Sequence, residues 1–227
     1  ETDEAIGHIL GQAYVVNANT PKDTYRSVVV FGNGYNSVGG RAALYVLDAA
    51  SGRLVRKIDT GAGEDNGRSV PALSDVNRAR CVDEAYAGDL KGNLWKFDLS
   101  ASDPAYWGIA YGEDLDGDGV IDAAAGDRPQ PLFAAPGQSI TGRPDVMAMA
   151  GACAPGGDGY MVIFGTGRYL GIEDRYDHSP QSVYGIWDFG DDGDDSEHLG
   201  AIVDRASGLL SSGLLLAPRQ VAAQLTQ

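Results

Sequence analysis

The chain has 227 residues, and its 17 Lys and Arg against 32 Asp and Glu give a formal net charge of −15 at pH 7. This balance argues against nucleic-acid binding, because neutralising phosphates needs a basic surface. It also argues against passive adhesion to anionic lipid headgroups. No stretch approaches the roughly 20 apolar residues of a membrane helix, and Glu1–Glu4 opens the chain without a signal peptide, as we expect of a processed or excised piece.

The sequence predicts an almost entirely β structure. Glycine is abundant, with 32 residues, and most of the chain consists of short runs between Gly, Asp, Asn and Pro, a pattern typical of strands and turns. Only two short helical candidates stand out, around Ser102–Tyr106 and over Pro218–Gln227.

In chain order, the same pattern of strands occurs three times. Each unit has a first strand, predicted at Gln12–Asn17, Ser69–Ser74 and Arg143–Met149. A β-rich run ending in glycines follows, at Ser27–Asn36, Glu84–Gly92 and Gly159–Arg168. A run of alternating apolar and aromatic residues then closes on Asp, at Ala43–Asp48, Asn93–Asp98 and Val183–Asp188. Outer strands are predicted at Leu54–Ile58 and Pro131–Ala134.

Repetition of such a unit predicts a β-propeller or a related array, in which one module cannot bury its apolar face alone. We assign the units to about residues 8–60, 68–135 and 138–190 of a single propeller segment covering residues 1–227, with a tail at 191–227. Propellers close with about 4 to 8 blades, so we expect part of a larger propeller. This favours a binding or scaffolding surface over a catalytic pocket.

An acidic stretch in the second unit matches the start of an EF-hand calcium loop. Asp114, Asp116 and Asp118 alternate, so their carboxylates can turn toward one hard cation. The carbonyl of Val120 supplies the seventh-position oxygen, and Asp122 acts directly or through water. The predicted metal ligands are therefore Asp114, Asp116, Asp118, Val120 and Asp122, and the alternative is a solvated acidic turn.

The loop departs from an EF-hand at its end. The twelfth position, where an EF-hand has a bidentate Glu, is Ala125, and Asp127 two residues further on is a candidate substitute. We expect weak Ca²⁺ affinity, on the order of 10⁻⁴ to 10⁻³ M. A later acidic group lacks the alternating pattern and is predicted to be a solvated loop: Asp188, Asp191, Asp192, Asp194, Asp195 and Glu197.

Four segments resemble the C-terminal domain of PilY-type proteins of type IV pili. They are Val29–Ser37 with Ala43–Gly52, Tyr86–Leu99 (YAGDLKGNLWKFDL), Phe164–Leu170 and Gln181–Asp188. The similarity runs from about Leu10 to Asp188, and Tyr86–Leu99 is its most specific part.

This resemblance implies an all-β, quinoprotein-like modified β-propeller, of which this chain holds about three to four blades. It implies an extracytoplasmic factor at the pilus tip, cell surface or outer membrane, acting in pilus biogenesis, cell adhesion and twitching motility. The implied partners are pilus tip or minor pilin components and a host surface receptor. The implied cofactor is Ca²⁺, which in the family governs the balance between pilus extension and retraction.

In the family, a calcium loop of the pattern D-x-N-x-D-G-x-x-D commonly precedes the Tyr-Ala-Gly-Asp-Leu motif. The corresponding stretch here, Asp75–Asp83, has Ala79 and Arg80 in place of the central Asp and the Gly. We therefore expect that this loop does not bind calcium.

The two cysteines, Cys81 and Cys153, lie in corresponding loops of neighbouring units. In an extracytoplasmic chain this arrangement indicates a disulfide, and the alternative is two buried free thiols.

We expect no enzymatic activity. Leu47–Gly52 resembles the docking repeats of quinone-dependent dehydrogenases, but the Trp that usually ends such a repeat is missing. Gly165–Gly171 is read as a hairpin turn, because it lacks the spacing of a dinucleotide-binding loop. A quinone-dependent dehydrogenase-like propeller and a purely structural, calcium-stabilised domain remain the alternatives.

Overall fold

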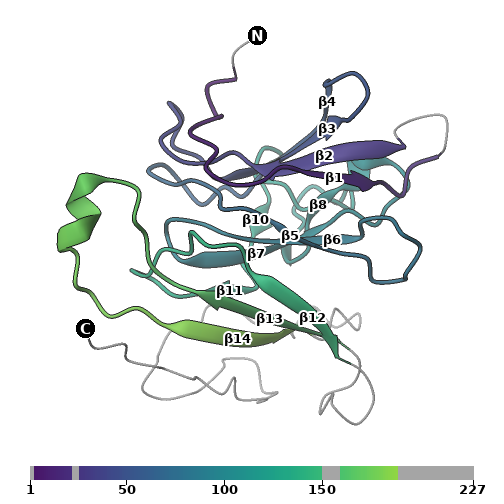
Figure 1. The fold of residues 1–227 in the computed structure, drawn as a ribbon. Helices are drawn as coiled ribbons and strands as arrows, with labels where there is room; N and C mark the ends of the chain where they lie inside the picture. Colours follow the sequence, from purple (N-terminus) through teal and green to yellow (C-terminus); the bar gives the residue numbers. More distant parts are fainter. Residues whose placement is uncertain (1–2, 22–25, 150–158, 189–227) are drawn as a thin grey trace.

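The computed structural model describes residues 3–21, 26–149 and 159–188, and these form three antiparallel sheets stacked face to face (Figure 1). The first sheet has the order β1 (Tyr14–Asn17), β2 (Ser27–Gly32), β3 (Ala43–Asp48) and β4 (Leu54–Asp59). The second has the order β11 (Phe133–Ala134), β7 (Asn93–Asp98), β6 (Glu84–Gly88) and β5 (Ala72–Ser74), with β8 (Gly108–Ile109) also paired to β7. The third has the order β12 (Asp145–Met149), β13 (Gly159–Gly165) and β14 (Val183–Asp188).

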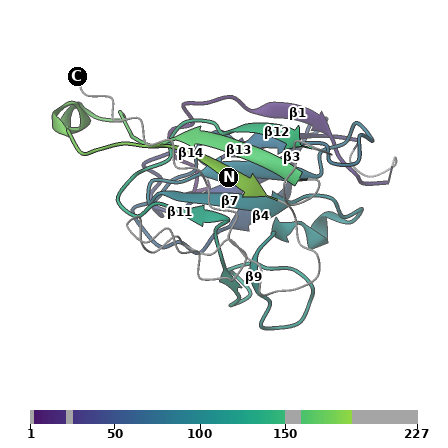
Figure 2. The ribbon, with the colours of Figure 1, turned by 90° about the horizontal axis from the view of Figure 1, so that it is seen from below.

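Four smaller elements complete the described part of the chain. The strands β9 (Gly112–Glu113) and β10 (Arg128–Pro129) pair with each other, and the two 3₁₀ helices are η1 (Pro104–Tyr106) and η3 (Ile172–Tyr176). Figures 1 and 2 both show the segment with η3 standing away from the stacked sheets. The described part of the chain contains no helix that is long and apolar enough to span a membrane.

The predicted all-β, partial propeller is confirmed, and the predicted strands occur in the predicted order. The outer strand predicted at Pro131–Ala134 is present as the shorter β11, and β8, which was not predicted, pairs with the opposite end of β7. The helical candidate near Ser102 is one turn of 3₁₀ helix, with Pro104 in its first turn and the Asp103 side chain capping the amide of Ala105. The second candidate, Pro218–Gln227, lies outside the described residues.

The second sheet is buried on both faces. Trp95 and Phe97 of β7 pack with Val28, Val30 and other residues of the first sheet. Leu94 of β7 points the other way and packs with residues of the third sheet. Because successive side chains of a strand point to opposite faces, one strand contributes to both apolar cores. Trp95 and Trp107 are core residues.

A buried ion-pair cluster joins the second sheet to the third. The Nζ atom of Lys96 lies 2.9 Å from a carboxylate oxygen of Glu84 and 2.9 Å from one of Asp188. Tyr86 and Tyr111 donate hydrogen bonds to Asp188, at 2.6 and 2.9 Å. Asp188 is only 1 % exposed, so the prediction that it belongs to a solvated acidic loop is wrong; the other members of that predicted loop lie outside the described residues.

The tight turn between β6 and β7 is organised by the buried carboxylate of Asp89. It accepts hydrogen bonds from the amides of Lys91 and Asn93, both at 2.9 Å. It also accepts from three side-chain donors: Asn93 Nδ2, Trp95 Nε1 and Asn66 Nδ2. Gly92 of this turn has φ +86°, and a Cβ there would lie 2.2 Å from the carbonyl oxygen of Ala135. The specific motif at Tyr86–Leu99 is thus explained by the geometry of the turn.

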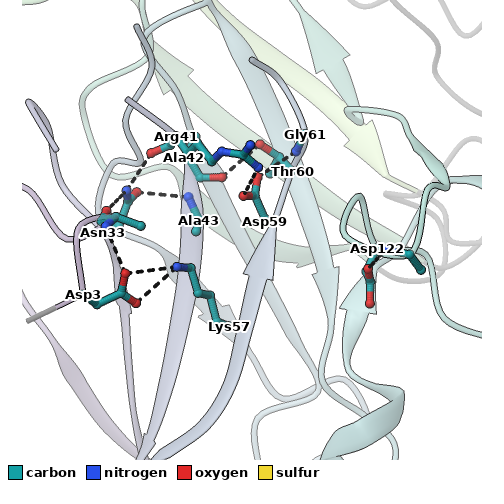
Figure 3. Close-up of polar contacts among 12 residues, drawn as sticks. Asp3, Asn33, Arg41, Ala42, Ala43, Lys57, Asp59, Thr60, Gly61 and Asp122 are labelled. Atoms are coloured by element: carbon teal, nitrogen blue, oxygen red, sulfur yellow. Dashed lines mark hydrogen bonds and ion pairs between the residues drawn. The ribbon is translucent and has the colours of Figure 1, made fainter. Parts of the chain in front are cut away.

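Side-chain contacts also hold the turns of the first sheet (Figure 3). The Asn33 amide donates to the carbonyls of Ala5 and Arg41, and its oxygen accepts from the amide of Ala43. Arg41 pairs with Asp59 at 3.1 Å. In Figure 3, Asp122 lies apart from this group, on a neighbouring segment.

Replacing Asp89 by Ala should destabilise the fold, because five donors in and around the turn lose their acceptor. Leaving buried donors unpaired costs about 1 to 3 kcal/mol each, so we expect a loss of about 3 kcal/mol or more in the free energy of unfolding, measured by urea denaturation. The control is Asp98→Ala on the exposed end of β7, which should cost well under half as much. Equal costs for the two variants would contradict the role assigned to Asp89.

Replacing Lys96 by Met should leave Glu84 and Asp188 buried without a cation. Burial alone would raise the pKa of Asp188, but the Lys96 charge and hydrogen bonds from Tyr86, Lys96 and Tyr111 hold it below its ordinary value. Breaking such a buried pair costs about 3 to 5 kcal/mol at pH 7.

The pH dependence of stability should then reverse. In the wild type, the lowered pKa of Asp188 means that its contribution is present above about pH 4 and is lost as the pH falls through that lowered value. In Lys96→Met, burial without the cation raises the pKa of the Asp188 carboxyl. The free energy of unfolding should therefore rise as the pH falls from 7 to 5. Urea denaturation between pH 7 and pH 5 measures the free energy of unfolding of the wild type and of Lys96→Met. The same pH dependence in both proteins would refute the role assigned to Lys96.

Candidate metal site

The acidic stretch forms a closed loop between β9 and β10. Its base is held by the pairing of Glu113 with Arg128, whose side chains also form an ion pair at 2.9 Å. Inside the loop, Ile121 bridges to Ile109 of β8, and the Val120 side chain is buried. The β9–β10 hairpin extends from one side of the stacked sheets (Figure 2). Two apolar anchors and a paired base therefore fix an otherwise exposed acidic segment.

The aspartates of this loop are turned inward by their own backbone. Asp114 accepts hydrogen bonds from the amides of Gly117 and Gly119, at 2.7 and 2.9 Å. Gly117 and Gly119 have φ values of +78° and +84°, a region that glycine occupies without steric cost. Asp116 accepts from the amide of Asp118 at 3.1 Å. The alternation of Asp and Gly thus builds a series of tight turns.

Three carboxylates meet in this loop: Asp114, Asp116 and Asp127. One oxygen of each lies within 4.8 Å of the others. Asp127 is buried and fixed, since it accepts from the amides of Leu115 at 2.8 Å and Asp122 at 3.0 Å. Asp114 and Asp116 are exposed. Closely spaced carboxylate oxygens are the ligands that Ca²⁺ prefers, and this is the one such group that includes three acidic, His or Cys side chains among the described residues.

The structure distributes the predicted ligands differently from an EF-hand. Asp114 and Asp116 are brought together, but Asp118 and Asp122 lie outside their group. Asp118 accepts from the amide of Val120 at 2.8 Å. Asp122 pairs with Arg56 of β4 at 3.2 Å. Asp127 joins the group although it lies beyond the twelve-residue pattern; the only sequence signal for it was that it is the next acidic residue after Ala125.

The electrostatics of the loop differ between the two exposed carboxylates, Asp114 and Asp116. Hydrogen bonds from the amides of Gly119 and Gly117 lower the pKa of Asp114. The pKa of Asp116 is raised, because partial desolvation and the charges of Asp118, Asp127 and Asp114 outweigh the hydrogen bond from the Asp118 amide. The repulsion that raises the pKa of Asp116 is what a bound cation would remove.

In the second acidic loop, Asp75–Asp83, both carboxylate oxygens of Asp83 and Oδ2 of Asp75 accept from protein donors, while Oδ1 of Asp75 is buried without a hydrogen-bond partner among the described residues. Asp83 is buried and accepts from the amides of Val76 and Asn77, at 2.7 and 3.2 Å, and from the side chains of Asn77 and Asn19. Asp75 accepts from the amide of Arg80 at 2.7 Å. Arg80 keeps a left-handed φ of +66°, at the position where the family pattern has glycine. The prediction that this loop binds no calcium stays a prediction.

The predicted disulfide stays a prediction as well. Cys81 is partly buried in a cleft lined by residues of β1, β5 and the loop before β6. Cys153 lies outside the described residues.

Comparison with known proteins gives the family. The family model of the PilY1 beta-propeller domain matches residues 5–215 of this chain. The chain belongs to this family. It is 36 % identical over 201 residues to a type IV pilus biogenesis factor PilY1 homolog of Xylella fastidiosa, covering 84 % of this chain and 13 % of that protein. It is 41 % identical over 175 residues to the type IV pilus biogenesis factor PilY1 of Pseudomonas aeruginosa PAO1, covering 70 % of this chain and 14 % of that protein.

A solved structure agrees with this assignment. The crystal structure of the Pseudomonas aeruginosa PilY1 C-terminal domain superposes with a TM-score of 0.71 at 30 % identity. The match covers 91 % of this chain and 42 % of that domain. The chain therefore spans less than half of the solved domain and about one seventh of the full-length relatives.

The raised pKa of Asp116 makes a prediction about pH. Without metal, ionisation of Asp116 is disfavoured in the folded state, so its effect on stability is favourable below about pH 4 and is lost as the pH rises through the raised pKa. Ca²⁺ binds the ionised carboxylate, so calcium affinity should increase with pH through that pKa and then level off. The measurement is carbon-detected NMR of the Asp116 carboxyl with and without about 10⁻² M CaCl₂, a concentration ten times the weakest expected dissociation constant. The pKa of Asp116 should fall when calcium is added. An unchanged Asp116 pKa would argue against a cation at this group.

Proposed function

We propose that this chain is a calcium-binding β-propeller segment of an extracytoplasmic type IV pilus biogenesis and adhesion factor. Family membership supports the role in the pilus, and the group Asp114, Asp116 and Asp127 supports the cation. We take residues 1–227 as one propeller segment, located at the pilus tip, cell surface or outer membrane. Its proposed partners are pilus tip or minor pilin components and a host surface receptor.

The proposed role of Ca²⁺ is to order the acidic loop against the sheets. Asp114, Asp116 and Asp127 would hold the ion, with Asp118, the carbonyl of Val120 and Asp122 as further candidates. Arg56 supplies the connection to the first sheet: its Nη2 contacts Asp122, and its Nε donates to the carbonyl of Trp107 at 3.0 Å. Neutralising the carboxylates favours the compact loop, which in turn keeps Asp122 in reach of Arg56.

A purely structural role for calcium is the second candidate function. It is favoured by the same Arg56 contacts, because they lie where the first and second sheets meet. In that case calcium would raise stability without changing how the pilus factor engages its partners.

We propose no enzymatic activity. Leu47–Gly52, the stretch that resembles a dehydrogenase docking repeat, runs from the end of β3 into the turn before β4. Within it, Asp48 accepts hydrogen bonds from the amides of Ala50 and Ser51 and from the Ser51 hydroxyl, and Gly52 has φ +71°. These contacts account for the motif as turn geometry, which is a property of the fold rather than of a reaction.

Calorimetric titration with CaCl₂ tests the site. The wild type should bind with a dissociation constant on the order of 10⁻⁴ to 10⁻³ M. Asp116→Asn should weaken binding about 10-fold or more, because a ligand charge is lost from the group. Asp122→Asn should weaken it about 3-fold or less, since its carboxylate is paired with Arg56 outside the group.

Asp145→Asn is the matched control, because it removes one exposed carboxylate from β12 in a different sheet. It should bind Ca²⁺ like the wild type. If Asp122→Asn weakened binding as much as Asp116→Asn, the EF-hand ligand pattern, which includes both residues, would hold in place of the group seen here.

The cellular role is tested by introducing Asp114→Asn with Asp116→Asn into the complete parent protein. We expect fewer surface pili and reduced twitching motility at equal amounts of exported protein, measured by shearing pili from the cells and by stab-agar assay. Normal pili and normal motility, with calcium binding lost in calorimetry, would leave calcium as a structural ion only.

A further inference from the structure

The three sheets repeat one detail of their middle strands. In each sheet, a glycine of one strand lies directly opposite an apolar residue of the next strand. The pairs are Gly32 with Leu44, Gly88 with Leu94, and Gly165 with Val183. Two residues before each glycine, and therefore on the same face, stand Val30, Tyr86 and Ile163. These equivalent positions allow the same face of the three sheets to be compared.

In the first two sheets, this face is covered by the next sheet of the stack. Val30 and Leu44 are fully buried in the core between the first and second sheets. Tyr86 and Leu94 are fully buried in the core shared with the third sheet. A sheet of this array thus buries the face that carries its glycine only against a neighbouring sheet.

The equivalent face of the third sheet, at one end of the stack, is exposed (Figure 1). Ile163 is 43 % exposed and Val183 is 45 % exposed. Gly185 of β14 lies opposite Ile163 on the same face. We call the surface formed by Ile163, Gly165, Val183 and Gly185 the open face. It is apolar, and it lies on the side of the third sheet that points away from the second.

The glycines show what crosses this face at the other two junctions. A Cβ on Gly32 would lie 2.3 Å from the carbonyl oxygen of Ser69, and a Cβ on Gly88 would lie 2.2 Å from Cγ2 of Ile140. Ser69 and Ile140 belong to the segments that lead into the first strand of the next sheet, β5 and β12. Glycine in a strand is typical of places where another backbone approaches closely, and here the approaching backbone is this leading segment.

Gly165 has no such neighbour among the described residues. A Cβ there would meet no atom within 4 Å, and its φ lies outside the left-handed region that favours glycine. Neither its backbone conformation nor its surroundings in the described part of the chain require a glycine. The equivalence with Gly32 and Gly88 supplies the reason that is missing within this chain.

We propose that the open face is the seat of the next sheet of the propeller, supplied by a part of the parent polypeptide outside this chain. The segment that leads into that sheet crosses Gly165, as Ser69 crosses Gly32 and Ile140 crosses Gly88. Apolar side chains of the new sheet cover Ile163 and Val183. The open face contains no residue of the acidic loop, so the proposal does not depend on calcium.

The length of the chain favours this occupant over the residues that follow β14. From the end of β3 to the end of β7, one further sheet with its connections takes 50 residues (98 − 48 = 50). Only 39 residues follow β14 (227 − 188 = 39), which is too few for a sheet of this kind. The chain covers 42 % of the solved domain, so a domain of that size has the residues that the open face requires.

The first test is Gly165→Ala in two contexts, measured by thermal unfolding. In the chain of 227 residues, Tm should stay the same or rise by up to about 4 °C, because alanine reduces the entropy of the unfolded state. In the complete parent protein, the Tm of the propeller should fall by about 2 °C or more, because the Cβ meets the crossing segment. The control Gly88→Ala should lower Tm in both proteins, since Ile140 is present in both.

A fall in Tm for Gly165→Ala in the chain of 227 residues would overturn the proposal, because the chain would then cover its own open face. An unchanged or raised Tm in both proteins would overturn it as well, because nothing would cross Gly165 in the parent.

The second test measures whether the open face is accessible, and it decides the question if Gly165→Ala does not fold in the parent. A maleimide probe should label Val183→Cys about 10-fold or more slowly in the parent than in the chain of 227 residues, as followed by mass spectrometry of the labelled peptide. The control is Val38→Cys, at a position 84 % exposed on the β2–β3 connection, which should react equally in both. Equal labelling of Val183→Cys in the two proteins overturns the proposal. So does protection in the parent that appears only as its concentration rises, because a second copy then covers the face.

Discussion

The structure depends on a middle sheet that has no solvent-facing side. On β7, Trp95 and Phe97 face the first sheet while Leu94 and Lys96 face the third. The third sheet shows the contrast, since Ile163 of β13 is exposed between the buried Val162 and Phe164. A strand buried on both faces cannot be polar on either unless every polar group is paired. The ion pairs of Lys96 and the hydrogen bonds of Asp89 satisfy this requirement.

The same constraint explains how far the sequence could predict the fold. Runs such as Asn93–Asp98 alternate types of side chain and end at glycine-rich turns, and both signals are local, so strand order was predictable. The burial of Asp188 was not, because its partner Lys96 lies 92 residues away and nothing local distinguishes it from the acidic residues that follow (188 − 96 = 92). The pairing of β8 with β7 was not predicted either, because a two-residue strand carries no periodicity.

The two acidic loops show why composition alone does not identify a metal site. In the loop Asp75–Asp83, two loop amides and the side chains of Asn77 and Asn19 donate to both carboxylate oxygens of Asp83. In the loop between β9 and β10, backbone amides hold Asp114 and Asp127, yet the two carboxylates still face each other and Asp116. Spacing predicted Asp114 and Asp116 there. Asp127 could not be predicted as firmly, because the β9–β10 pairing that returns it to the group is a contact between strands.

Arg56 provides the charged contact between the acidic loop and the first sheet, in addition to the apolar anchors Val120 and Ile121. It lies on β4 of the first sheet, contacts Asp122 of the loop, and donates to the carbonyl of Trp107, whose side chain is in the core between the first two sheets. A ligand shifts a conformational equilibrium only by its difference in affinity for the two states. For the proposed calcium ion, that difference has to arise where the loop contacts the sheets. These contacts include the Arg56–Asp122 ion pair, the bridge of Ile121 to Ile109 and the buried Val120 side chain. Any effect of the proposed ion on the propeller would therefore act both through a partly exposed ion pair and through the packing of Ile121 against the core between the first two sheets.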